Sequence, residues 1–248
     1  MKKIFTFVLA LVAMTAVMAQ SRVFINTWNA QDLTKYDNQQ KNISMSRYMF
    51  SGWNTLCIPF SMTEEQINEA FGSDCRVETL IAAEEDANGV MVYFGDVKAN
   101  GIEANKPYLI YYAGESKYKS VRLDDVTINA TGAEALVCNT NKGSEVALIG
   151  TYSHIDGLDS YGILAKDNSD TKFVPVTTGL NGFYPTRCFL TVNGGNDVSV
   201  SFMHGAPTSI SNVAAQGQQS SDIYNLKGMK VSEYYKGLVI KNGKKFVK

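Results

Sequence analysis

The chain has 248 residues, of which 45% are hydrophobic, and a formal net charge of -1. That length is ample for a packed core and suits one large β domain or two small ones. The small net charge hides an asymmetry. Residues 20–221 carry 14 basic and 22 acidic side chains, a balance of -8, whereas residues 222–248 carry 7 and 2, a balance of +5. An acidic body argues against nucleic acid as a partner.

The first nineteen residues have the pattern of a secretory signal peptide. A positively charged start precedes a nearly continuous apolar run over residues 4–17, and Val17 and Ala19 are the small residues that signal peptidase reads. A transmembrane helix needs about 20 apolar residues, and neither this run nor any later one meets that length. We therefore expect an exported, soluble chain that begins at Gln20, lies outside the inner membrane and has no transmembrane span.

Strand patterns follow one another along most of the chain. Alternating or continuous apolar residues predict strands at residues 23–28, 53–60, 77–82, 90–94, 108–112, 121–128, 146–151, 161–165, 173–176, 187–192 and 198–203. The second of these should turn three residues toward the core: Leu56, Ile58 and Phe60. One helix is predicted, with Thr63 as N-cap, Gln66 completing a capping box and Gly72 ending it. This pattern predicts an all-β fold, a β-sandwich body with one short helix.

The composition changes after residue 203. Residues 204–221 are rich in Gly, Ser, Ala and Gln, which is typical of a linker. Three short strands are predicted beyond it at residues 223–226, 237–241 and 244–247, and Asn242-Gly243 joins the last two in a hairpin. We therefore expect four parts: a signal peptide (1–19), a body (20–203), a linker (204–221) and a small C-terminal β-hairpin element (222–248).

The cysteines do not point to a metal site. In an exported chain, four cysteines allow three complete pairings that the sequence does not rank, and these are Cys57, Cys75, Cys138 and Cys188. No two of them lie within a few residues of each other, and neither histidine is near one, which disfavours metal binding. Cys57 lies in an apolar strand, so a buried free thiol is an alternative to a bridge there.

Catalytic motifs are absent from the sequence. It has no nucleophile elbow, phosphate-binding loop, dinucleotide fingerprint or His-Glu-x-x-His pair. His154 and His204 have no recognisable catalytic partner, and the acidic clusters at residues 84–86 and 124–125 are typical of solvated turns. The acidic loops at residues 156–159 and 167–170 do not match calcium-loop spacing. We expect no enzymatic activity, no cofactor and no metal, with a cryptic hydrolase as the third-ranked function.

Carbohydrate binding is the second-ranked function, and it rests on the abundance of aromatic residues. Eight of them could include a surface that stacks against a sugar: Trp28, Trp53, Tyr111, Tyr112, Tyr152, Tyr161, Phe183 and Tyr184. Most are expected in the core. Tyr111 and Tyr112 are neighbours in one strand and point to opposite faces, so at least one of the two should be exposed.

The C-terminal tail has a distinctive set of residues: Tyr224, Asn225, Leu226, Gly228, Val231, Lys236, Gly237, Asn242, Gly243 and Lys244. They match a family pattern that reads roughly Tyr-Asp-Leu-x-Gly-Arg-x-Val, then Gly-x-Tyr-x-Val/Ile, then a Lys-rich end. In this respect the tail resembles the sorting domain of the type nine secretion system, found in exported proteins of Bacteroidota-type bacteria. Val239 stands where the family usually has Tyr, and the tail is shorter than a full sorting domain. The resemblance implies that export machinery is a partner, and that the protein reaches the cell surface or medium, with the periplasm as the fallback.

The lysines of the tail also have a simpler interpretation. Lysine on an edge hairpin blocks edge-to-edge aggregation, which would account for Lys241, Lys244, Lys245 and Lys248. It would not account for the Ile-Tyr-Asn-Leu-x-Gly start of the tail.

Four stretches of the body, residues 53–60, 104–110, 149–152 and 187–190, resemble a β-module of secreted Bacteroidota proteins that reads WNTLCLPF…GKPYLI…GTY…RAFL. This resemblance implies a location and an architecture, and no catalytic role. The function that we expect first is an exported, non-catalytic interaction or structural module of the cell surface, whose ligand, a glycan or a protein, the sequence does not identify.

Overall fold

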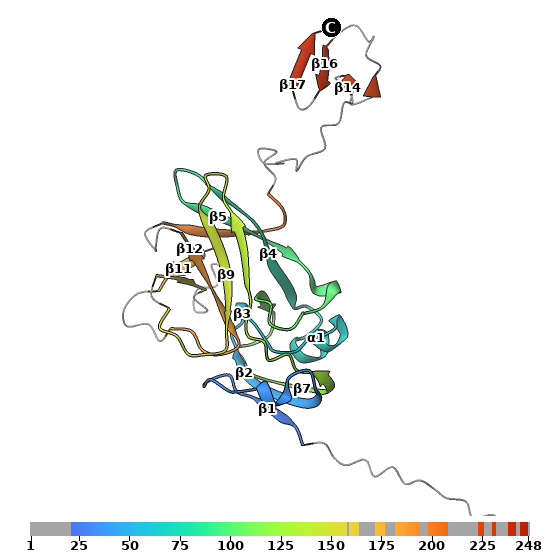
Figure 1. Ribbon diagram of the computed structural model, residues 1–248, viewed down its shortest axis with the longest axis vertical. Coiled ribbons are helices and arrows are strands. Elements are labelled where there is room, and N and C mark those ends of the chain that lie inside the picture. The colour runs from blue at the N-terminus through green and yellow to red at the C-terminus, as the bar shows by residue number, and fades with distance from the viewer. Residues whose placement is uncertain are drawn as a thin grey trace, which may run out of the picture. The chain divides into compact units, whose positions relative to one another are not determined.

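Strands make up most of the chain, as the sequence predicts. The computed structural model describes residues 21–157, 159–163, 172–176, 182–193, 198–207, 223–225, 230–231, 238–241 and 244–247. The chain divides into two compact units, Met1–Pro207 and Thr208–Lys248. The predicted signal peptide and residues 208–221 of the predicted linker lie outside the described residues. The first unit is an all-β sandwich with one short α-helix (Figure 1).

Three strands form the smaller sheet of the first unit, in the order β1-β2-β7. Their bounds are β1 (Val23–Ile25), β2 (Gln40–Met49) and β7 (Lys117–Thr127). β1 runs parallel to β2, and β7 runs antiparallel to it. The sequence pattern did not predict β2, because Arg47 occupies an inward position between Met45 and Met49 and interrupts the apolar alternation.

Ten strands form the larger sheet, and all but one of their pairings are antiparallel. In spatial order they are β3 (Gly52–Leu56), β6 (Tyr108–Tyr112), β4 (Arg76–Glu85), β5 (Val90–Asp96), β13 (Val200–His204), β11 (Lys172–Pro175), β10 (Tyr161–Gly162), β12 (Arg187–Val192), β9 (Glu145–Thr151) and β8 (Ala135–Asn139). β13 pairs in parallel with β5. The sheet curls, so that β3 also contacts β12 and β4 also contacts β8.

Two hydrophobic cores lie on opposite sides of β3 and β6. In β6, Tyr108, Ile110 and Tyr112 enter the first core, which the smaller sheet and the helix complete. Leu109 enters the second core, enclosed by the rest of the larger sheet, and Tyr111 packs against its edge. Leu56, Ile58 and Phe60 are fully buried, as predicted. The other face of β3 is buried as well, because the second core covers it.

The one α-helix forms where the capping pattern predicts it. α1 (Glu64–Phe71) starts after Thr63, whose hydroxyl accepts from the Gln66 backbone N–H at 3.3 Å while the Gln66 side chain accepts from the Thr63 N–H at 2.9 Å. Its buried residues Ile67, Ala70 and Phe71 join the first core. Gly72 ends the helix at a φ of 101°. Two short 3₁₀ turns complete the helical elements, η1 (Thr34–Tyr36) and η2 (Lys98–Asn100).

The second unit is a small four-stranded sheet in the order β15-β14-β16-β17. Its strands are β14 (Ile223–Asn225), β15 (Lys230–Val231), β16 (Leu238–Lys241) and β17 (Lys244–Val247). Three strands were predicted, and β15 is additional. β16 and β17 pair antiparallel, with Lys241 opposite Lys244, which fits the predicted two-residue turn between them.

The described residues include part of the predicted sorting motif. Tyr224 and Asn225 lie in β14, Val231 in β15 and Lys244 in β17. The remaining motif residues lie outside the described residues: Leu226, Gly228, Lys236, Gly237, Asn242 and Gly243.

Burial of Phe60 predicts a large loss of stability when its ring is removed. The Phe60→Ala variant should lose about 3–5 kcal/mol of unfolding free energy, measured by urea denaturation, because its side chain is fully buried. Phe24→Ala is the matched control, since the Phe24 side chain is 53% exposed, and it should lose less than about 1 kcal/mol. Equal losses in the two variants would contradict the two-core arrangement.

Candidate functional site

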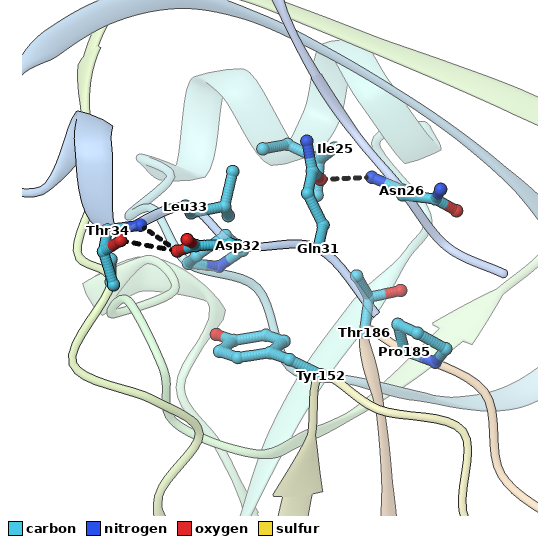
Figure 2. Close-up of a pocket in the computed structure, with 11 residues that line it drawn as sticks. Ile25, Asn26, Gln31, Asp32, Leu33, Thr34, Tyr152, Pro185 and Thr186 are labelled. Carbon is cyan, nitrogen blue, oxygen red and sulfur yellow. Dashed lines mark hydrogen bonds between the residues drawn. The ribbon is translucent and has the colours of Figure 1, made fainter. Parts of the chain in front are cut away.

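A pocket of about 120 Å³ opens between the segment that follows β1 and the segment that precedes β12. Its lining residues come from several separate stretches of the chain: Ile25, Asn26, Gln31, Asp32, Leu33, Thr34, Pro59, Ala130, Tyr152, Pro185 and Thr186. Figure 2 shows the ring of Tyr152 on one side of the pocket and Gln31 and Asp32 on the other. Apolar groups form much of the wall, and polar groups from residues 26–34 border it.

Hydrogen bonds within residues 24–34 fix the polar side of the pocket. The Asn26 side-chain oxygen accepts from the backbone N–H groups of Trp28 and Asn29, at 2.9 and 3.0 Å. The Gln31 side chain accepts from the Asn26 N–H at 2.9 Å (Figure 2). It also donates to the Phe24 carbonyl at 2.7 Å. These hydrogen bonds take the place of those in a helix or strand. A loop whose backbone groups bond to its own side chains holds one conformation.

Among the described residues that line the pocket, Asp32 is the only charged one. Its Oδ1 atom accepts from the hydroxyl and the backbone N–H of Thr34, at 2.5 and 2.9 Å. These two hydrogen bonds lower the pKa of Asp32 below its ordinary value, so the carboxylate is ionised at neutral pH. Its other oxygen accepts no hydrogen bond from the described residues, which leaves that oxygen available as an acceptor.

Three aromatic residues that contact one another flank the pocket lining in the chain. Trp28, which is 47% exposed, meets Tyr184 edge to face with ring centroids 5.1 Å apart. Tyr184 in turn stacks on His154 at 4.6 Å. Trp28 is two residues from Asn26, Tyr184 is next to Pro185, and both Asn26 and Pro185 line the pocket. We call Trp28, Tyr184 and His154 the aromatic patch.

Behind the pocket lies a buried arginine. Arg47 is only 2% exposed and donates to the carbonyl oxygens of Thr186, at 2.6 Å, and of Thr55. Burial is the main cause of a strong lowering of its pKa, and the positive charge of Arg187 adds to it. Among the described residues no carboxylate forms an ion pair with Arg47, so backbone carbonyls compensate its charge.

Thr186, which lines the pocket, has an unusual backbone conformation. Its φ is 66°, in the left-handed region that β-branched residues rarely adopt. Its carbonyl accepts from Arg47 and from the Cys57 backbone N–H, and its own hydroxyl is buried without a partner among the described residues. Strained residues of this kind persist where their surroundings hold them, and they concentrate at functional sites.

The cysteines and Tyr152 beneath the pocket are poor nucleophiles. The Tyr152 hydroxyl donates to the Asn105 side-chain oxygen at 2.7 Å, and the Cys57 thiol to the Asn105 carbonyl at 3.1 Å. Burial raises the pKa of Cys57 and of Cys188 to about 12, and it also raises the pKa of Tyr152. All four cysteines are free thiols, and only Cys138 is partly exposed. A thiol with a raised pKa is inert at neutral pH.

A second cluster of polar and aromatic groups surrounds His204. β13 includes this residue, so the last strand of the body ends one residue later than predicted. His204 Nδ1 is hydrogen-bonded to Glu78 at 2.5 Å, and its ring stacks on Trp53 with centroids 4.5 Å apart. A histidine oriented by a carboxylate is part of a catalytic triad. Among the described residues, however, no serine, threonine or cysteine side chain is hydrogen-bonded to His204, so the triad has no nucleophile here.

Neither of the two predicted stacking residues lines the pocket, and only Tyr111 belongs to this second region. Tyr112 is buried in the first core, which leaves its ring no room for a ligand. Tyr111 is half-buried, and its ring contacts Trp53 and the Arg76 guanidinium. The alternation rule therefore predicts the opposite orientations of the two rings correctly. Both rings nevertheless pack against other residues of the fold.

Carboxylates of both acidic clusters, at residues 84–86 and 124–125, bind other side chains of the fold. Glu85 accepts hydrogen bonds from Ser144 and Thr140 at 2.6 and 3.2 Å, which join β4 to the turn between β8 and β9. Asp124 pairs with Arg22 at 2.6 Å. Within the described residues no three His, Cys, Asp or Glu side chains are placed to hold a metal ion. The acidic residues Asp167 and Asp170 lie outside the described part of the chain.

The sequence does not predict that Trp28, Tyr184 and His154 form the aromatic patch, although Trp28 and Tyr184 are among the eight aromatic candidates. The pattern places Trp28 in a strand, but β1 ends at Ile25. The only local signal is the Asn-rich stretch around Trp28, which favours a turn. Contact between residues 28 and 184 depends on the complete topology.

Comparison with known proteins adds no assignment. No protein-family model, curated protein or solved structure matches this chain. No helix in the described residues is long and apolar enough to cross a membrane.

The Glu78–His204 pair predicts a pH dependence of stability. Burial raises the pKa of Glu78 above its ordinary value, an effect that His204 partly offsets. A carboxyl group with a raised pKa stabilises the fold most below its ordinary pKa, and that contribution is lost as the pH rises through the raised value. The stability of the parent relative to Glu78→Gln should therefore fall as the pH rises above about 4.3, the ordinary pKa of a glutamate, measured by urea unfolding. Glu115→Gln, at an exposed position, is the matched control. A stability difference between the parent and Glu78→Gln that stays constant with pH would refute the assignment.

Proposed function

We propose that this protein is an exported, non-catalytic binding module of the cell surface, and that it binds its ligand at the pocket and the aromatic patch. The observation that carries this proposal is the exposed Trp28 ring in edge-to-face contact with Tyr184, where each residue lies within two positions in the chain of a residue that lines the pocket. An exposed aromatic next to a concave site is a typical element of ligand recognition.

The chemistry around the pocket supports binding rather than catalysis. Asp32 is exposed and has a lowered pKa, whereas a general acid at neutral pH needs a raised one. Cys57 and Tyr152 are held in their protonated forms by burial. The described residues that line the pocket thus offer hydrogen bonds and packing surfaces, without an activated nucleophile and base.

Delivery to the surface is proposed from the two ends of the chain. The signal-peptide pattern of residues 1–19 supports export across the inner membrane. The resemblance of residues 222–248 to a type nine sorting domain supports passage across the outer membrane. The separation of Thr208–Lys248 as a compact unit with its own sheet fits a recognition element that export machinery can bind at exposed strand edges.

Deleting residues 222–248 should separate folding from delivery. The remaining chain should keep a melting temperature within about 5 °C of the parent, because among the described residues the deleted strands pair only with each other. In a bacterium with a type nine system, cell fractionation should find the truncated protein in the periplasm with its signal peptide removed.

A charge variant serves as the control for this deletion. Lys241→Gln with Lys245→Gln removes two hairpin lysines that are not among the matched motif residues, so delivery should be retained if the tail is a sorting signal. Unchanged surface levels after the deletion would end the sorting proposal. A collapsed melting temperature would make the tail a structural part of the body.

A further inference from the structure

We propose that the pocket and the aromatic patch bind a neutral glycan that contains an N-acetylated amino sugar, with the sugar ring on Trp28 and the acetamido group in the pocket. This inference rests on the proposed function and names the ligand class of the same site. It follows from the position of the aromatic patch, the size and lining of the pocket, and its charge.

The aromatic patch offers a flat, fixed surface. Almost half of Trp28 is exposed, while Tyr184 supports the edge of its ring and is itself stacked on His154. The face of a hexose ring carries axial C–H groups, which pack against an indole in the same way as other apolar surfaces. Because the rings constrain each other, little conformational entropy is lost when a ligand packs on them.

The pocket is too small for a large group. Its volume of about 120 Å³ lies below the roughly 300–1,000 Å³ that drug-sized ligands occupy. It has room for a substituent of a few heavy atoms. Its walls are mainly apolar and include Ile25, Leu33, Pro59, Ala130 and Pro185. A methyl group would pack well against such walls, whereas a bare hydroxyl would lose its hydrogen bonds to water there.

The polar border of the pocket suits an amide N–H. One oxygen of Asp32 is occupied by Thr34 and the other accepts nothing within the described residues. An acetamido group combines a methyl for the walls with an N–H that can donate to this free oxygen. The negative charge of Asp32 disfavours acidic sugars and phosphates, which agrees with the excess of acidic residues in the body.

The sugar ring and its substituent must be able to reach both places at once. Tyr184 directly precedes Pro185 and Trp28 is two residues from Asn26, and both Pro185 and Asn26 line the pocket. The assignment requires that the acetamido group of a sugar packed on Trp28 enter the pocket, so changes at Trp28 and at Asp32 should both weaken binding.

Isothermal titration calorimetry of the full chain with three matched trisaccharides tests this assignment. Tri-N-acetylchitotriose should bind, and cellotriose, which has hydroxyl groups in place of the acetamido groups, should bind about tenfold or more weakly. The trimer of glucosamine is cationic and lacks the methyl groups. It should also bind more weakly than the acetylated trimer, although Asp32 attracts it.

Variants of the site locate the binding. Trp28→Ala should weaken binding of the acetylated trimer about tenfold or more, and Asp32→Asn should weaken it less, because an amide oxygen still accepts. Phe24→Ala is the matched control, since Phe24 is equally exposed on β1 and does not line the pocket. This control should bind like the parent.

Each contrary result has a distinct meaning. Equal binding of cellotriose, with loss in Trp28→Ala, would overturn the acetamido assignment and keep the proposed binding function. Binding of a proline-rich peptide at Trp28, without glycan binding, would replace the ligand class with a protein. No binding of any of the three trisaccharides would overturn the ligand class, and no binding of the peptide either would remove the proposed binding function of the site as well.

Discussion

A buried cation, the guanidinium of Arg47, joins three segments of the body. It extends from β2 in the smaller sheet and donates to the carbonyls of Thr55 in β3 and of Thr186 before β12. These segments belong to both sheets, and the two hydrophobic cores meet around them. A buried charge is costly unless polar groups surround it. The carbonyl groups around Arg47 must therefore keep their positions, and this requirement fixes the sheets relative to each other.

The same contacts shape the candidate site. Thr186 holds a left-handed conformation because Arg47 and the Cys57 N–H both bind its carbonyl. Its conformation sets the direction of the chain at Pro185 and thus the place where Tyr184 meets Trp28. The contact between Trp28 and Tyr184 therefore depends on Arg47 and Thr186. The polar residues of the pocket are held by hydrogen bonds within residues 24–34. Such an arrangement is preformed, which reduces the entropy lost on binding.

The sequence predicts the strands in which apolar and polar residues alternate regularly. It does not predict a strand in which a polar residue interrupts this alternation or in which no residue is buried. Residues 108–112 and 187–192 form strands with the predicted bounds, and Thr63 caps the helix. β2 escapes prediction because Arg47 interrupts its apolar face, and β8 because it has no buried residue. At the site, composition identifies Trp28 and Tyr184 as two of eight candidates. Only the topology, which brings residues far apart in the chain together, distinguishes them from core aromatics.

The dependence on Arg47 can be measured directly with Arg47→Met, which keeps a long apolar stem and removes the guanidinium. Loss of its hydrogen bonds should leave buried carbonyl groups unsatisfied, at a cost of about 1–3 kcal/mol. Replacing a buried charge by an apolar side chain can also be neutral or stabilising, so the sign of the change is informative. Urea unfolding of this variant should show a lower free energy of unfolding than the parent. A variant as stable as the parent, or more stable, would show that the body does not depend on this cation.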